Sequence, residues 1–187
     1  LGLEGESDFH VLATGYETNA VYVYNPHPNS RMPRRGLHYT LDDGFAWRPA
    51  EAKGLAGDVI GLAVHPSDPK TVAAATQSGI FLSKDAGATF EPVMTGVQGL
   101  AVFFDLDGKH LWYSTWNGTA RLARAPLSGG VNAEVKLPPL ARDAVAYIAQ
   151  NPARRSEYAI ATFGRDVYVS GDAGRTWRAI ALRGEGK

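Results

Sequence analysis

Acidic residues, a histidine and an arginine stand at the starts of several short apolar runs, where their side chains could do chemistry. They are Asp8, His10, Asp58, Arg142 and Asp143. Carboxylates and a histidine that converge at one end of a channel could bind a cation or a sugar hydroxyl. The alternative is that each of them caps a strand or a neighbouring turn. No H-x-H or H-E-x-x-H spacing occurs, so the sequence predicts no metal site and no cofactor.

A second candidate is residues 25–36, the most basic stretch of the chain, which carries Arg31, Arg34 and Arg35. The guanidinium group forms paired hydrogen bonds with a carboxylate or a phosphate. Three prolines in this stretch indicate an extended, irregular loop. If any segment binds an anionic partner, we expect it to be this one, and the alternative is an ordinary solvated loop.

The elements that must position these residues come from an internal repeat. Ser83–Phe90 and Ser170–Trp177 both read S-x-D-x-G-x-T-aromatic, and Thr40–Trp47 is a looser copy. Their aspartates are 43 and 87 residues apart, which predicts a further copy near residue 128. A degenerate copy is present there, with Ala125 in place of the aspartate. The box residues are Asp42, Gly44, Trp47, Ser83, Asp85, Gly87, Thr89, Phe90, Ser170, Asp172, Gly174, Thr176 and Trp177.

Short runs rich in Val, Ile, Tyr and Ala lie between the boxes, bounded by Gly, Pro, Asn or Asp, which is typical of strands. No segment has a sustained 3.6-residue apolar period, so we expect little helix. Four short strands about every 43 residues predict an all-β fold, a β-propeller of four-stranded antiparallel blades. We expect one domain over residues 1–187, with blades at about 1–50, 51–95, 96–140 and 141–187.

We expect the boxes to be structural. The aspartate can accept hydrogen bonds from the backbone of its own turn, and the glycine is expected at positive φ. The aromatic residue packs between strands. The turn should lie on the outer edge of the blade, with its carboxylate directed away from any central site. A second aromatic set, on the middle strands, could stack on sugar rings or pack between blades: Tyr22, Tyr24, Trp112, Tyr113 and Trp116.

The box pattern resembles the Asp-box family, also called BNR repeats, which includes sialidases, sortilin-type receptors and photosystem assembly factors. The opening Asp8–His10 and the run Pro66–Pro69 are most similar to small bacterial extracytoplasmic Asp-box proteins, often described as sialidase-like or glycosyl-hydrolase-like. This resemblance implies a secreted or periplasmic location. It also implies that a sialidase-type enzyme carries three arginines, a Tyr–Glu pair, an acidic Asp and an F/Y-R-I-P motif. That motif does not occur, and Arg31-Met32-Pro33 matches it only at the arginine and the proline.

Composition narrows the possible partners. Nineteen basic and nineteen acidic side chains balance, which argues against a general binder of nucleic acid or anionic membranes. Cysteine is absent, which excludes disulfides, thiolate metal sites and a cysteine nucleophile. No apolar run approaches the roughly 20 residues of a membrane span. The hydrophobic fraction, 44%, is enough for a substantial core.

For the closure of the propeller ring and for the function, the sequence leaves an expectation and its alternatives. The family resemblance implies six or more blades, so we expect missing blades, preferably N-terminal ones, or an oligomeric partner to close the ring, with a compact four-blade ring as the alternative. We expect a non-catalytic binding or scaffold module for a protein, glycan or small ligand. The alternatives are an exo-glycosidase of sialidase type, with part of its active site outside this chain, and a purely structural domain of a longer chain.

Overall fold

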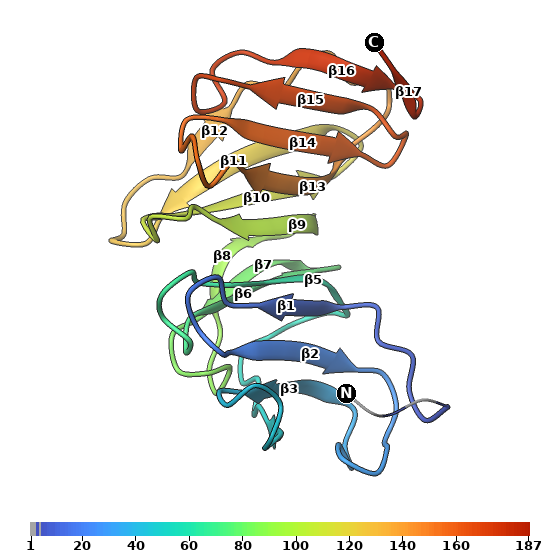
Figure 1. Ribbon diagram of the computed structural model, residues 1–187, viewed down its shortest axis with the longest axis vertical. Coiled ribbons are helices and arrows are strands. Elements are labelled where there is room, and N and C mark those ends of the chain that lie inside the picture. The colour runs from blue at the N-terminus through green and yellow to red at the C-terminus, as the bar shows by residue number, and fades with distance from the viewer. Residues whose placement is uncertain (1–2, 4) are drawn as a thin grey trace.

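Strands make up the regular structure of the described chain, Leu3 and residues 5–187 of a computed structural model (Figure 1). Blade 1 consists of β1 (Leu12–Thr14), β2 (Val21–Asn25), β3 (Gly36–Thr40) and β4 (Arg48–Pro49). Blade 2 consists of β5 (Val59–Val64), β6 (Val72–Thr76), β7 (Gly79–Ser83) and β8 (Glu91–Thr95). Blade 3 consists of β9 (Gln98–Phe104), β10 (His110–Trp116), β11 (Ala120–Pro126) and β12 (Ala133–Val135). Blade 4 consists of β13 (Val145–Gln150), β14 (Tyr158–Thr162), β15 (Val167–Ser170), β16 (Arg178–Leu182) and the short β17 (Glu185–Gly186).

In every blade, each strand pairs antiparallel with the next one along the chain, so the predicted all-β propeller architecture is confirmed. The first strands of the blades, β1, β5, β9 and β13, lie side by side in a row down the middle of Figure 1. β1 and β13 stand at opposite ends of this row, so the four blades form an open arc and not a closed ring. Within the described residues, no helix is long and apolar enough to cross a membrane.

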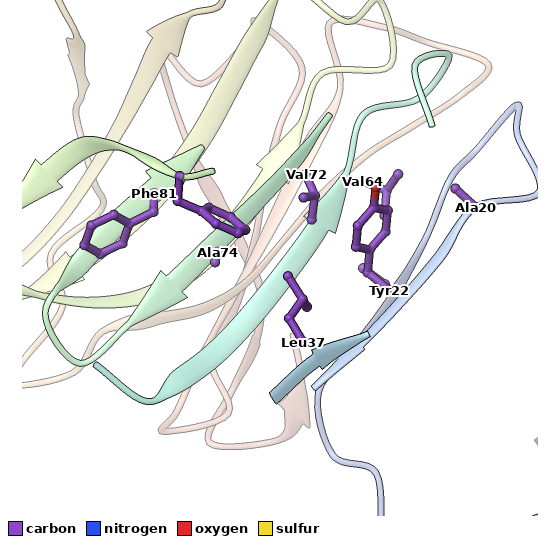
Figure 2. Close-up of a cluster of buried hydrophobic side chains, with 9 residues drawn as sticks. Ala20, Tyr22, Leu37, Val64, Val72, Ala74 and Phe81 are labelled. Atoms are coloured by element: carbon purple, nitrogen blue, oxygen red, sulfur yellow. The ribbon is translucent and has the colours of Figure 1, made fainter. Parts of the chain in front are cut away.

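The hydrophobic cores lie between neighbouring blades. In Figure 2, Tyr22 and Leu37 of blade 1 point toward Val72, Ala74 and Phe81 of blade 2. Successive side chains of a strand point to opposite faces of the sheet. In a blade that has a neighbour on each side, a middle strand therefore buries the side chains of both faces. β6, with the sequence VAAAT, is accordingly buried along its whole length. Each blade therefore depends on its neighbours for much of its apolar burial.

Each box forms the tight turn between the third and fourth strands of its blade. The box glycine and the residue before it both have positive φ: 58° at Asp43 and 89° at Gly44, and 60° at Ala86 and 80° at Gly87. The blade 4 box repeats this geometry, with 58° and 82°. Two consecutive residues with positive φ are typical of a type I′ turn.

Candidate functional site

The candidate residues from the sequence share one end of the blades, which we call the rim. In antiparallel pairing, the start of the first strand lies beside the end of the second: Val59 pairs with Thr76, and Val145 with Thr162. The rim therefore contains the starts of the inner strands together with the hairpin loops that follow the second strands. Residues 25–36 are the longest of these loops.

Two ion pairs account for several of the candidates at the rim. His10 Nε2 lies 2.9 Å from Asp8 Oδ2, and both side chains are largely exposed. Arg35 Nη2 lies 3.4 Å from Asp58 Oδ1, which connects the basic loop of blade 1 to the start of the inner strand of blade 2. Exposed pairs of this kind contribute little to stability, about 0–1 kcal/mol.

The basic loop is anchored and not fully solvated. Met32 is completely buried, and the side-chain amide of Asn25 donates hydrogen bonds to the carbonyl oxygens of Met32 (3.1 Å) and Arg34 (2.8 Å). Arg31 is exposed, as are Arg34 and Arg35. The loop thus places its arginines in solvent on a fixed backbone, a suitable arrangement for binding an anionic group.

Asp143 is held by the backbone of its own blade. Its Oδ1 accepts a hydrogen bond from Ala144 N at 2.8 Å, and both carboxylate oxygens lie 3.1 Å from Gly164 N. A Cβ at position 164 would stand 2.6 Å from Asp143 Oδ2, so a larger residue there would displace the carboxylate from this position. Arg142, directly before it, is held at φ 52°, a conformation that costs a non-glycine residue about 1 kcal/mol or more.

A pocket of about 200 Å³ opens beside this carboxylate, between blades 3 and 4. Two aromatic side chains line it, the half-buried Trp116 and Phe163, which is 61% exposed. They occupy the same place in the repeat, directly after a buried threonine near the end of the second strand. The full lining is Leu100, Trp116, Arg142, Asp143, Ala144 and Phe163. The pocket thus combines ring faces, a cation and a fixed carboxylate.

Sequence reasoning singled out Arg142 and Asp143 but missed Phe163, and it placed Trp116 only within a general aromatic set. The signal was present in the repeat, where Thr115-Trp116 aligns with Thr162-Phe163. The other members of that aromatic set have different environments. Trp112 and Tyr113 are buried between blades.

The box carboxylates lie at the opposite end of the blades from the rim, each within a local set of hydrogen bonds. Hydroxyl and backbone donors lower the pKa of all three, first among them the Thr40 hydroxyl for Asp42 and the Thr89 hydroxyl for Asp85. In blade 4 the Thr176 hydroxyl, with further donors, lowers the pKa of Asp172 to about 2. These donors satisfy the carboxylates inside their own turns, so the boxes fix the hairpins.

A cluster of Asp105, Asp107 and His110, also away from the rim, offers ligand atoms within 4.8 Å of one another. Asp105 is already engaged: Tyr158 Oη donates to it at 2.6 Å, and His110 Nδ1 lies 3.2 Å away. Burial raises the pKa of Asp105. Because Tyr158 belongs to blade 4, the cluster joins blades 3 and 4, and its geometry is explained without a cation.

Comparison with known proteins supports the fold. No family model and no curated protein matches the chain. Among solved structures, a GH74 enzyme of Niastella koreensis is 16% identical with a TM-score of 0.67, covering 90% of this chain and 29% of its own. An ancestral GH74 enzyme is 15% identical with a TM-score of 0.72, covering 94% and 24%. YCF48 bound to D1 peptide is 16% identical with a TM-score of 0.44, covering 95% and 69%.

The chain therefore spans about a quarter of the length of the GH74 enzymes that it resembles. At these identities the likeness shows the fold alone. The fold defines the class: an arc of four β-propeller blades, with a rim pocket between the third and the fourth.

Proposed function

We propose that the chain is a non-catalytic binding module of the Asp-box kind, and that its rim pocket between blades 3 and 4 binds a sugar ring of a glycan. The observation that carries the proposal is the exposure of Phe163, 61%, beside Trp116 in a pocket that also contains Arg142. An exposed ring in a concave site offers a flat apolar face, while the guanidinium and the fixed carboxylate can hydrogen-bond hydroxyl groups.

The carboxylates of the rim support binding more than hydrolysis. Most glycoside hydrolases use a proton-donating acid and a second carboxylate roughly 5–9.5 Å away, and the sialidase type uses an acid together with a Tyr–Glu pair. Asp8, Asp58 and Asp143 are each engaged, with His10, with Arg35 and with backbone N–H groups. An exo-glycosidase whose remaining carboxylates lie outside this chain is the competing proposal. The extracytoplasmic location belongs with the Asp-box resemblance and is proposed on that basis alone.

Binding to an immobilised glycan panel tests the proposal, with substitutions at two exposed phenylalanines. Phe163→Ala should weaken binding by about tenfold or more, because it removes the stacking surface. The matched control is Phe45→Ala in the blade 1 box, where the ring is 88% exposed and lies far from the pocket. It should leave binding unchanged.

A panel of fluorogenic aryl glycosides separates the competing function. Turnover that disappears in Asp143→Asn would support the exo-glycosidase and overturn the proposal. Glycan binding that survives Phe163→Ala, with protection from labelling confined to residues 26–36, would move the site to the basic loop.

A further inference from the structure

The three interfaces between neighbouring blades repeat one contact. In the second strand of each blade, two neighbouring residues face opposite blades. The first of them, such as Val72, faces the preceding blade, and the second, such as Ala73, faces the next blade. Tyr22 thus packs in one core with Val72, and Ala73 packs in one core with Leu111. At the third interface, the ring of Trp112 stacks on Tyr158 with centroids 4.6 Å apart.

Strand pairing extends this series to a fourth pair. Ala73 pairs with Ala63 in β5, and Ala159 pairs with Ala149 in β13, so they occupy the same position. Val21 pairs with Thr14 in the same way that Val72 pairs with Val64. The end blades each have one face without a neighbouring blade, which we call the open face. The fourth pair is therefore Ala159 on the open face of blade 4 and Val21 on the open face of blade 1.

Both members of the fourth pair are less buried than their counterparts. Ala73 and Ala75 are fully buried under blade 3, whereas Ala159 and Ala161 at the same positions are only half-buried. Val72 is fully buried, whereas Val21 is half-buried. The two end faces are thus continuous in register with the internal interfaces but lack the neighbour that covers them.

The blade 1 box shows what a missing neighbour would supply. Trp177 Nε1 of blade 4 donates to Lys136 O, at 2.9 Å, in the connection that leads out of blade 3. Trp47 Nε1 of blade 1 is buried and has no hydrogen-bond partner within the described chain. A carbonyl from the connection after a preceding blade would satisfy this donor. The chain after β16 would be that connection if blade 4 of another molecule occupied the place.

The open face of blade 1 leaves room for such a contact at the box end. At its rim end, Val23 and His38 are already buried within the described chain. Val21 and the box lie toward the other end of the same strands. A Cβ at Gly44 would meet nothing but its own Trp47, at 3.8 Å, so the space beside the box turn is open.

We propose that a second copy of this chain binds head to tail, with blade 4 of each molecule packed against blade 1 of the other. Two such contacts close a twofold ring of eight blades, a number within the usual range for propellers. Each of the two contacts joins two different faces, so that Ala159 of one molecule is buried against Val21 of the other. It is independent of any ligand in the rim pocket.

Light scattering coupled to size exclusion tests the proposal, and the wild-type chain should have the mass of a dimer. Ala159→Arg and Val21→Arg should each raise the dissociation constant of the dimer by about 100-fold, because each buries an unpaired charge at both junctions. Ala133→Arg, at an exposed position of β12, is the matched control and should remain dimeric. Thermal melts of all three variants verify folding.

A cysteine pair tests the geometry directly, because the chain contains no other cysteine. Under mild oxidation, Val21→Cys with Ala159→Cys should form a covalent dimer, and either single variant should not form the same product. A monomer at every concentration would overturn the proposal. So would a dimer broken by Ala159→Arg but unaffected by Val21→Arg, since that pattern requires blade 4 to pair with blade 4. If the ring is instead closed by blades from a longer parent chain, the wild-type chain should have the mass of a monomer, which is the outcome that overturns the proposal.

Discussion

The box turns of blades 1 and 2 share a hydrogen-bonded centre. In blade 2, Asp85 Oδ1 accepts hydrogen bonds from Ser83 Oγ (2.8 Å) and Thr89 N (2.9 Å). In blade 1, Asp42 Oδ1 accepts the equivalent pair from Thr40 Oγ1 (2.5 Å) and Ala46 N (3.0 Å). The backbone follows the same path although only the aspartate and the glycine are identical in the two boxes, so this part of the turn is encoded within about eight residues.

The second carboxylate oxygen distinguishes the two turns. Thr89 Oγ1 donates to Asp85 Oδ2 at 2.6 Å, whereas Ala46 stands at that position in blade 1 and has no hydroxyl to offer. Their surroundings differ more. A Cβ at Gly87 would stand 3.0 Å from Ala50 and Leu37 of the preceding blade, but one at Gly44 would find open space on that side. The turn is thus built locally, and its packing depends on the blade before it.

Substituting the two box glycines should give the largest effect. Gly87→Ala forces a Cβ into Leu37 and Ala50 and also places alanine at φ 80°. The expected loss in unfolding free energy is about 2–4 kcal/mol. Gly44→Ala carries the same conformational cost without the clash, so the expected loss is about 1 kcal/mol. Urea denaturation of both variants measures the difference. Equal losses would show that the preceding blade does not press on the turn.

Exchanging the threonine and the alanine should give a smaller effect. Thr89→Ala removes the hydrogen bond to Asp85 Oδ2 and should lower the unfolding free energy by about 0.5–1.5 kcal/mol. Ala46→Thr adds the missing hydroxyl donor in blade 1 and should raise the unfolding free energy by roughly a few tenths of a kcal/mol. Thermal unfolding of the two variants checks both signs. A stabilising Thr89→Ala would contradict the comparison.

Titration should give the smallest effect, because the carboxylates are exposed and screened by solvent. The pKa of Asp172 is about 2, below the usual value near 3.9. A lowered pKa means that the box contributes stability above about pH 4 and loses it as the pH falls through about 2. Carboxyl-carbon NMR should follow this midpoint, and Thr176→Ala should raise it. An unchanged midpoint in that variant would show that the Thr176 hydroxyl is not the main cause of the lowered pKa of Asp172.

The fold could be predicted from the sequence because its information is local and repeated. The box pattern occurs three times, and the runs between the boxes are short and apolar, so the strand order within a blade follows without long-range contacts. The prediction that the box turn lies on the outer edge was incomplete, because Gly87 and Gly174 pack against the preceding blade. That contact joins residues of different repeats, and no pattern within one repeat contains it.

The candidate site was less predictable for the same reason. The pocket brings Phe163 of blade 4 to Trp116 of blade 3, and the pair Arg35–Asp58 connects two blades. Met32 lies in a stretch whose prolines and arginines are typical of solvated loops, yet it is completely buried. Its burial comes from tertiary packing, which the composition of the loop does not reveal.

The box turns of blades 2 and 4 pack on the blades before them, which gives the chain a direction of assembly. The backbone of Phe90 also donates to Lys53 O, in the connection that precedes blade 2. When a new blade leaves the ribosome, the surface that receives its turn has therefore already been synthesised. Vectorial synthesis from the N-terminus then matches the order in which the interfaces can form, and these turns never wait for a segment still to be translated.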